Sequence, residues 1–223
     1  MFYVVLSFLM TNDFIYKVNA LKHLVSVALP GEEVQLEMAP FIRKPLNHYL
    51  QQPTFNPQAS AVGVIVYPAG NDLEIILIQR PSYNGHHSNQ IAFPGGKKES
   101  VDESLYHTAV REVNEEIGIG LESLDFIGEL SKLYIPVSNF MVYPFLFFCS
   151  SRPPVTPFAQ EVEDVLYVSV RNELLNAGLK AMEKVRLTPD LIGEVPCYKI
   201  QNKIVWGATA MILREVEDVF QRM

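Results

Sequence analysis

The chain has 223 residues, of which 48% are hydrophobic and 19% are charged. This length and composition are typical of one globular domain with a sizeable core, and they argue against a second full domain. The net charge of −7 argues against nucleic-acid binding, which needs a basic face, so an anionic substrate would have to be drawn in by a local cation. Cys149 and Cys197 are expected to be buried free thiols of a cytoplasmic protein.

The first ten residues are apolar, but they are too short to span a bilayer. They also lack a basic leader and a small-residue cleavage site, so we expect neither an export signal nor a membrane partner. We interpret Met10 as the natural start, so that residues 1–9 would not be native. If they do belong to the protein, we expect a tail that is either flexible or buried by a partner. A peripheral membrane anchor is the less favoured alternative.

Residues 1–57 are interpreted as an N-terminal addition to a main domain at 58–223. Residues 11–13 form a helix N-cap cluster, and apolar residues at helical spacing follow it, which predicts a helix that ends at Leu29. Residues 32–57 contain four prolines and are predicted to be a connector with little regular structure.

Two apolar runs begin the main domain, and both are typical of strands. Residues 61–68 and 73–80 are predicted to pair as a hairpin across a turn at 69–72. Further strands are predicted at 90–93, 124–130, 133–136, 141–149, 165–168, 197–200 and 203–206, and helices at 171–177 and 208–221. Together with a long helix in the middle of the chain, these elements favour an α/β sandwich, in which a mixed sheet has helices on both faces.

Two places in these strand predictions allow a further local prediction. Pro144 cannot donate a ladder hydrogen bond, which predicts an edge strand or a bulge at that position. Gln201 and Asn202 separate two strand-like runs and predict a two-residue hairpin turn.

The polar loop at 81–89 contains His86 and His87. Adjacent histidines suggest a metal site or a general base. Neighbours in an extended chain point to opposite sides, however, so we favour a position on the surface or at the rim of the substrate site.

The most informative stretch, 93–119, joins a Gly-Gly turn to a helix that carries three clustered glutamates. The helix is predicted to begin at 100–102 and to end at Ile117, because Gly118 is a natural C-terminal stop. Apolar residues recur every four positions and mark its buried face: Leu105, Ala109, Val113 and Ile117.

Glu112 and Glu116 fall at the edge of this apolar face, and Glu115 lies one step further round. Carboxylates held this close repel each other, and burying them is costly unless a cation compensates. Magnesium is a natural partner, because it prefers oxygen ligands and binds through one or two carboxylates. The alternative is a solvated face on which the glutamates form salt bridges with Arg111, as in most charge runs. The preceding glycine turn favours the metal site.

Gly96, Glu103 and the sequence REVNEEIGI at 111–119 resemble the Nudix box of the Nudix hydrolases. The second half fits at every position. The first half holds one extra residue, because the usual spacing from Gly96 reaches Asp102, whereas the usual spacing back from Arg111 reaches Glu103. This lengthening, with FPGGK before it, is similar to the coenzyme A pyrophosphatase subgroup.

The upstream signature of that subgroup is kept only in part. Arg80 and the sequence FPGG at 93–96 match it. Pro81, Gly85 and Asn89 stand where the subgroup has Ser, Arg and Gly.

The resemblance covers residues 61–213 and implies the Nudix fold, an α/β/α sandwich with a mixed sheet, here with an N-terminal helical extension. It also implies hydrolysis of a diphosphate bond with Mg²⁺ or Mn²⁺ as cofactor. Glu112 and Glu116 would be the principal metal ligands. Further ligands that it implies are Glu115, which could instead orient water, and the carbonyl of Gly96. Arg111 would orient the glutamates by charge-assisted hydrogen bonds.

The resemblance also points to a general base in the sequence EVEDVLYV, where some related enzymes carry a glutamate. Glu161 is our candidate, with Glu163 and Glu115 as alternatives. An equally weighted interpretation is that Glu161 lies on the surface ahead of a strand and has no catalytic role.

The substrate implied is a small-molecule nucleotide diphosphate, either coenzyme A or a short acyl derivative. ADP-ribose, nucleotide sugars and dinucleotides are alternatives, as is a nucleotide-binding regulatory module without turnover. A homodimer is left open. The residues expected to bind the substrate are Arg80, Lys97, Lys98, His86 and His87.

Overall fold

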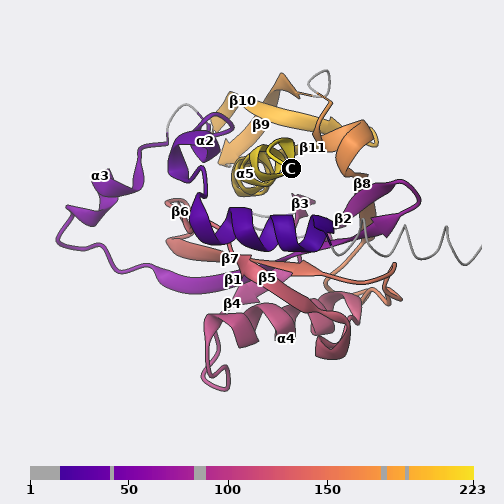
Figure 1. Ribbon diagram of the computed structural model, residues 1–223. Coiled ribbons are helices and arrows are strands. Elements are labelled where there is room, and N and C mark those ends of the chain that lie inside the picture. Colours follow the sequence, from indigo (N-terminus) through magenta and orange to yellow (C-terminus); the bar gives the residue numbers. More distant parts are fainter. Residues whose placement is uncertain (1–15, 41–42, 83–88, 177–179, 189–190) are drawn as a thin grey trace, which may run out of the picture.

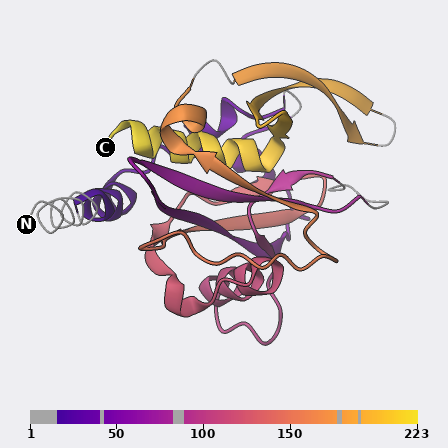
Figure 2. The same cartoon turned by 90° about the vertical axis from the view of Figure 1, so that its right-hand side faces the viewer.

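The computed structural model describes residues 16–40, 43–82, 89–176, 180–188 and 191–223. Helices lie on both faces of a mixed β-sheet: α4 (Leu105–Ile117) covers one face, and α5 (Gly207–Gln221) with the helix at 16–27 covers the other (Figure 1). Figure 2 shows the same strands running between α5 and α4. The predicted α/β/α sandwich is confirmed. No helix in the described part of the chain is long and apolar enough to cross a membrane.

The large sheet has the strand order β3-β2-β1-β7-β5, with β4 on β1, β6 on β7 and β8 on β2. Its strands are β1 (Gln58–Ala69), β2 (Asp72–Gln79), β3 (Ile91–Ala92), β4 (Gly95–Lys97), β5 (Asp125–Glu129), β6 (Leu133–Ile135), β7 (Phe140–Phe148) and β8 (Asp164–Ser169). β1 and β7 are parallel, and the other pairs are antiparallel. The predicted hairpin of β1 and β2 is confirmed.

Both faces of the central strands are buried, which explains why the first run is apolar at nearly every position. Val64 and Val66 pack in the cluster on the α5 side, and Ile65 and Tyr67 pack in the cluster on the α4 side. Gly63 lets α4 approach β1 closely, since a Cβ there would lie 2.5 Å from a methyl carbon of Val113.

Of the edge strand and the bulge predicted at Pro144, the edge strand is wrong, because β7 has partners on both sides. The ladder is irregular there, since residues 130–132 lie opposite only Tyr143 and Pro144. The carbonyl oxygen of Pro144 accepts from the N–H of Leu130. This residue lies in the gap between the end of β5 and the start of β6, which pair with the same edge of β7. Within a strand the N–H and C=O of one residue point the same way, so the N–H that proline lacks also faces this gap. The parallel ladder with β1 therefore loses no hydrogen bond.

The N-terminal segment contains more regular structure than its prolines suggested. Besides the helix at 16–27, it forms α2 (Glu32–Leu36) and α3 (Leu46–Leu50). Pro45 stands just before the first residue of α3, where a missing N–H costs no helical hydrogen bond. The predicted N-cap at 11–13 lies outside the described residues.

This segment packs against the C-terminal helix. Leu21 and Val25 lie in the same core cluster as the buried face of α5. The Gln35 side chain of α2 donates to the buried carboxylate of Glu215 in α5, over 2.9 Å.

A second, three-stranded antiparallel sheet covers the outer side of α5 (Figure 2). It consists of β9 (Lys180–Thr188), β10 (Leu191–Ile200) and β11 (Lys203–Trp206). The predicted turn between the last two strands is confirmed, with φ of 49° at Gln201 and 63° at Asn202. β9 and the first half of β10 were not predicted, and the helix predicted at 171–177 is a short π-helix at Val170–Leu174.

Candidate active site

The loop between β4 and α4 is longer than predicted, because the helix begins at Leu105 and not at 100–102. Ser104 is its N-cap, and its hydroxyl oxygen accepts from the N–H of His107 over 3.3 Å. Asp102 does not start the helix because its carboxylate is bound elsewhere. It accepts from the N–H of Glu99 over 2.8 Å and from the hydroxyl of Thr108 over 2.9 Å.

Arg111 contacts several of the acidic residues of the site. Its Nε and Nη2 donate to the two oxygens of Asp102 over 2.9 and 3.0 Å, and its Nη2 also donates to the carbonyl of Lys97 over 3.2 Å. This buried pairing holds the pKa of Asp102 well below its usual range. The Glu103 side chain is 86% exposed. The motif allowed two acidic positions, Asp102 counted from Gly96 and Glu103 counted back from Arg111. Asp102 is the one that binds Arg111.

Arg111 also contacts two of the clustered glutamates. Its Nη1 lies 2.9 Å from Glu112 and 2.7 Å from Glu115. Glu115 is 53% exposed and fits the interpretation as part of a solvated, salt-bridged face. Glu112 is 13% exposed, and burial raises its pKa. The arginine thus fixes Glu112 from the solvent side.

The Gly-Gly turn has no room for side chains. A Cβ at Gly96 would lie 2.4 Å from Oε1 of Glu112, so the backbone of the turn and this carboxylate lie in direct contact. At Gly95, φ is 158° and a Cβ would lie 2.4 Å from the carbonyl oxygen of Ala61. Gly95 requires glycine because its backbone lies against β1, whereas a side chain at Gly96 would displace the carboxylate of Glu112.

Glu116 is the most deeply buried of the glutamates, with 1% of its surface exposed. Its Oε2 accepts from the N–H of Gly95 over 2.8 Å, and its Oε1 lies 3.8 Å from Nη1 of Arg80. Burial raises its pKa to about 8, against the opposing effects of Arg80 and the Gly95 hydrogen bond. Glu116 therefore does not lie on a solvated face.

Glu161 lies in a loop that is fastened to the end of α4. The N–H groups of Thr156 and Phe158 donate to the carbonyls of Ile117 and Glu116, each over 2.9 Å. Glu161 is exposed, and its charge contributes to the raised pKa of both Glu112 and Glu116. The predicted general base thus lies within electrostatic range of the two buried carboxylates.

The remaining predicted residues differ in their environment. Lys97 is exposed at the end of β4, whereas Lys98 donates to the carbonyl of Asp102 over 2.7 Å. His86 and His87 lie outside the described residues.

The carboxylates suit a hard divalent cation in chemistry. In this conformation no three His, Cys, Asp or Glu side chains of the described residues form a group that could hold a metal ion. Magnesium, however, binds through as few as one or two carboxylates and keeps water in its other positions. Glu116 faces its guanidinium partner at 3.8 Å, beyond hydrogen-bonding distance, so its buried charge is incompletely compensated.

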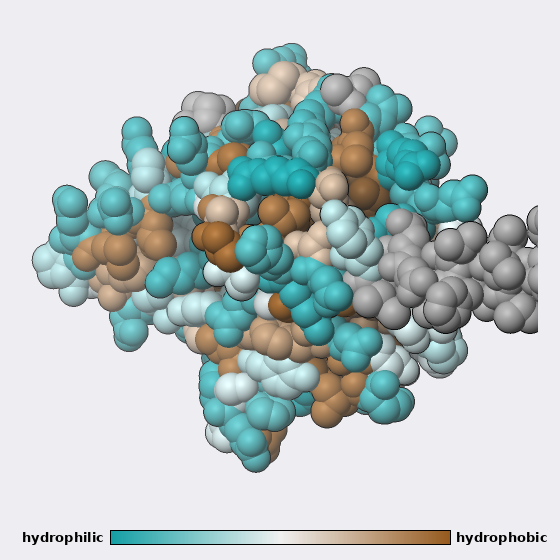
Figure 3. Space-filling view, in the orientation of Figure 1, coloured by the Kyte–Doolittle hydropathy of each residue, from teal (hydrophilic) through white to brown (hydrophobic). Residues whose placement is uncertain are grey.

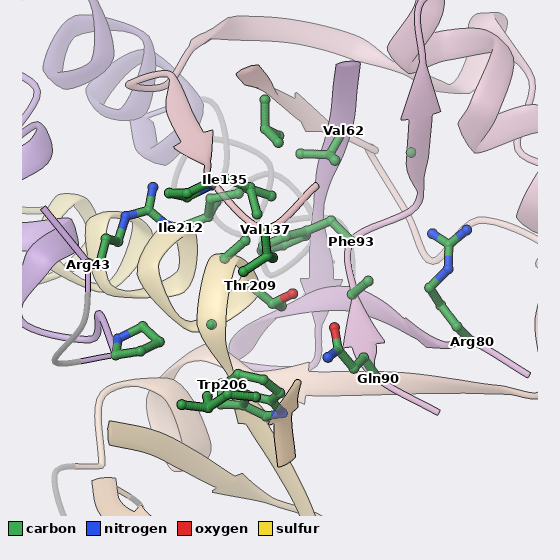
Figure 4. A pocket seen from close by; sticks show the side chains of 18 of the residues that line it. Arg43, Val62, Arg80, Gln90, Phe93, Ile135, Val137, Trp206, Thr209 and Ile212 are labelled. Carbon is green, nitrogen blue, oxygen red and sulfur yellow. The ribbon is translucent and has the colours of Figure 1, made fainter. Parts of the chain in front are cut away.

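A cavity of about 280 Å³ lies next to the surroundings of Glu116, and Figure 4 shows side chains that line it. Arg80 and Gly95, which both contact Glu116, belong to its lining. Arg43, Tyr49 and Trp206 line it from distant parts of the chain. None of these three was among the residues expected to bind the substrate. The only tryptophan of the chain, placed directly before a helix, was an available signal.

The NUDIX domain family matches residues 57–191. The chain therefore belongs to this family. An uncharacterized Nudix hydrolase, NudL of Yersinia pestis (strain Pestoides F), is 28% identical over 142 residues, which span 64% of this chain and 70% of the relative. The protein is accordingly an enzyme, a Nudix hydrolase of pyrophosphate bonds.

Two solved structures share the fold. The Nudix hydrolase RenU from M. smegmatis is 13% identical, with a TM-score of 0.52 over 75% of this chain and 88% of that chain. The MutT protein from Methanosarcina mazei Go1 is 20% identical, with a TM-score of 0.50 over 77% of this chain and 100% of that chain.

Proposed function

We propose that the protein hydrolyses coenzyme A or a short acyl derivative, with a divalent metal, to adenosine 3′,5′-bisphosphate and 4′-phosphopantetheine. A water oxygen bonds to one phosphorus of the diphosphate, the bridging P–O bond breaks, and each product keeps one of the two phosphates. The observation that supports hydrolysis at this site is the pair of carboxylates held against the Gly-Gly turn, the partly buried Glu112 and the buried Glu116 beside Arg80.

Glu112, Glu116 and the carbonyl of Gly96 would hold Mg²⁺ or Mn²⁺, with Glu115 as a further ligand. A bound divalent ion neutralises phosphate charge and orients the attacking water. The neighbouring residues keep the carboxylates in place. Arg111 holds Glu112 by an ion pair, and the N–H of Gly95 holds Glu116 by a hydrogen bond.

Glu161 is proposed as the general base that takes the proton from water. It stands on a loop tied to α4 by two backbone hydrogen bonds and is close enough to influence both buried carboxylates. Glu163 is the matched comparison, because it is also exposed and lies two residues further on. We expect Glu161→Gln to lower kcat strongly while Mg²⁺ affinity is kept, and Glu163→Gln to change neither. The reverse pattern would move the role to Glu163.

Coenzyme A is favoured over other diphosphates by FPGGK, Arg80 and the lengthened motif. Arg80 lies beside Glu116, where a phosphate could meet its guanidinium. Lys97 and Lys98, with His86 and His87, are proposed to supply the positive charge that an arginine at position 85 would otherwise give. Replacing either lysine by alanine should raise KM for coenzyme A more than for dephospho-coenzyme A, which lacks the 3′-phosphate.

The decisive experiment is turnover of a panel containing coenzyme A, acyl-coenzyme A, ADP-ribose, a nucleotide sugar and a dinucleotide, with Mg²⁺, Mn²⁺ or EDTA and products identified by mass. Glu116→Gln should abolish metal-dependent turnover, whereas Glu103→Gln should not, because that side chain is 86% exposed. Faster hydrolysis of ADP-ribose than of coenzyme A would overturn the substrate assignment. Saturable nucleotide binding without any product would favour a regulatory module.

A further inference from the structure

The cavity beside the carboxylates lies between the large sheet and α5, and it extends away from the diphosphate site. Figure 4 shows Arg80 and Arg43 on opposite sides of it, with apolar side chains between them. Phe93 and Ile212 form part of these walls, from the sheet side and from α5. A substrate whose phosphate contacts Arg80 would therefore direct its remaining part into this space.

At one end of the cavity, Arg80 has a hydrogen-bond donor that an anion could use. The Nε atom of Arg80 is buried and has no hydrogen-bond partner among the residues that the structure describes, and its Nη1 lies 3.8 Å from Glu116. A buried donor without a partner is unfavourable, and a phosphate oxygen would satisfy it. This places the diphosphate at the boundary between the carboxylates and the cavity.

The N-terminal segment forms the opposite end. Arg43 lines the cavity, and its Nη2 donates to the carbonyl of Tyr134; burial lowers its pKa to about 10. Tyr49 of α3 also lines the cavity, and its ring packs edge-on against Tyr134 with centroids 4.8 Å apart. The surface over α3 carries one of the hydrophobic areas of this face (Figure 3). The segment before β1 therefore completes a cavity that the NUDIX domain begins.

We propose, resting on the function proposed above, that this cavity is the subsite for the acyl-pantetheine arm and that the N-terminal segment sets the length of arm it accepts. The walls between the two arginines favour this occupant over a nucleobase. They are mainly apolar, with aliphatic side chains outnumbering the rings of Tyr49, Phe93 and Trp206. The hydroxyl of Thr209 already donates to the carbonyl of Ile91 over 2.9 Å. A largely apolar arm with few amide groups suits such walls, and the polar edge of a base does not.

Trp206 makes the subsite directly measurable, because it is the single tryptophan of the chain and lines the cavity. The probe is S-hexanoylpantetheine. It lacks phosphate, so its binding should not require a metal ion. Titration in EDTA should change the tryptophan fluorescence saturably. Ala208→Phe, which adds bulk to the lining, should weaken binding at least tenfold. Ala28→Phe, at an exposed position outside the lining, is the matched control and should leave it unchanged.

The role of the N-terminal segment is tested by Tyr49→Ala, which removes a ring from the lining and enlarges this end of the cavity. The ratio of kcat/KM for octanoyl-coenzyme A to that for coenzyme A should rise several-fold, with the melting temperature recorded as a check on folding. An unchanged ratio in a folded variant would remove the segment from this role.

The two proposals fail separately. If hexanoyl-coenzyme A is hydrolysed but S-hexanoylpantetheine causes no saturable fluorescence change, the subsite is overturned and the proposed function stands. If the probe binds and Ala208→Phe prevents it, while no coenzyme A derivative is hydrolysed, the cavity assignment stands and the proposed substrate falls.

Discussion

Replacing Glu116 by glutamine should make the metal-free protein more stable at neutral pH, although it removes a proposed metal ligand. Glu116 is 1% exposed, and burial raises its pKa from 4.5 to about 8. Its carboxyl group must therefore take up a proton on folding at pH 7. Glutamine is neutral at every pH, has nearly the same shape and keeps an oxygen that can accept from the N–H of Gly95.

The size of the effect follows from proton linkage. A group whose pKa is raised on folding contributes its full stability below the unfolded-state pKa, and this contribution is lost as the pH rises through the folded-state pKa. Each pKa unit corresponds to about 1.4 kcal/mol, so the loss from Glu116 is about 3 kcal/mol at pH 7 and below about 1 kcal/mol at pH 5. Glu116→Gln should therefore raise Tm at pH 7 by roughly 5–10 °C and hardly change it at pH 5.

The assay is thermal unfolding followed by circular dichroism, in EDTA at pH 5 and pH 7 and then with Mg²⁺. A cation would compensate the buried carboxylate, so Mg²⁺ should stabilise the wild type much more than Glu116→Gln. Glu103→Gln is the matched control and should behave as wild type, since this side chain is 86% exposed. A Glu116→Gln protein that is less stable than wild type at pH 7 in EDTA would refute the reasoning, because the carboxylate would then be well compensated by the fold itself.

Two further substitutions test the geometry of the site. Gly96→Ala places a Cβ against the carboxylate of Glu112 and should lower kcat at least about tenfold with little change in melting temperature, and wild-type activity would show that the carboxylate is free to shift. Asp102→Asn breaks the two-point contact with Arg111 and should cost roughly 3 kcal/mol in urea unfolding. A loss within the range of an exposed pair, below about 1 kcal/mol, would mean that this contact adds little to folding.

The elements of the fold that were predictable are those with a strong local period. Leu105 and Val113 follow the four-residue spacing of a helix and are turned toward the sheet, and β1 and β2 have apolar centres, AVGVIVYPA in β1 and IILI in β2. The missed β9 has neither signal, because its sequence, KAMEKVRLT, mixes charged and apolar residues on a partly exposed sheet. Such a strand is specified by its pairing with β10 and not by its own composition.

Within the site, the local sequence identified the glutamates but not the residues that position them. Asp102 resembles a helix cap in the sequence, and only the fold shows that it binds Arg111 while Ser104 caps the helix. The cavity as a whole could not be predicted, since Arg43 and Trp206 are 163 positions apart in the chain and come to line one space only through the packing of α5 and the N-terminal segment. Contacts of this kind leave no periodic pattern in either segment.

Arg80 joins the two parts of the site, because it faces Glu116 and also lines the cavity. Its attraction opposes the rise in the pKa of that carboxyl group. A diphosphate that binds Arg80 would bring its oxygens beside Glu116, where they could serve as further ligands of a metal ion held by this carboxylate. Mg²⁺ and the non-hydrolysable α,β-methylene-ADP are therefore expected to bind cooperatively. Calorimetric titration should show tighter Mg²⁺ binding in the presence of the analogue, and Arg80→Gln should remove the difference. Equal Mg²⁺ affinity with and without the analogue in the wild type would contradict this coupling.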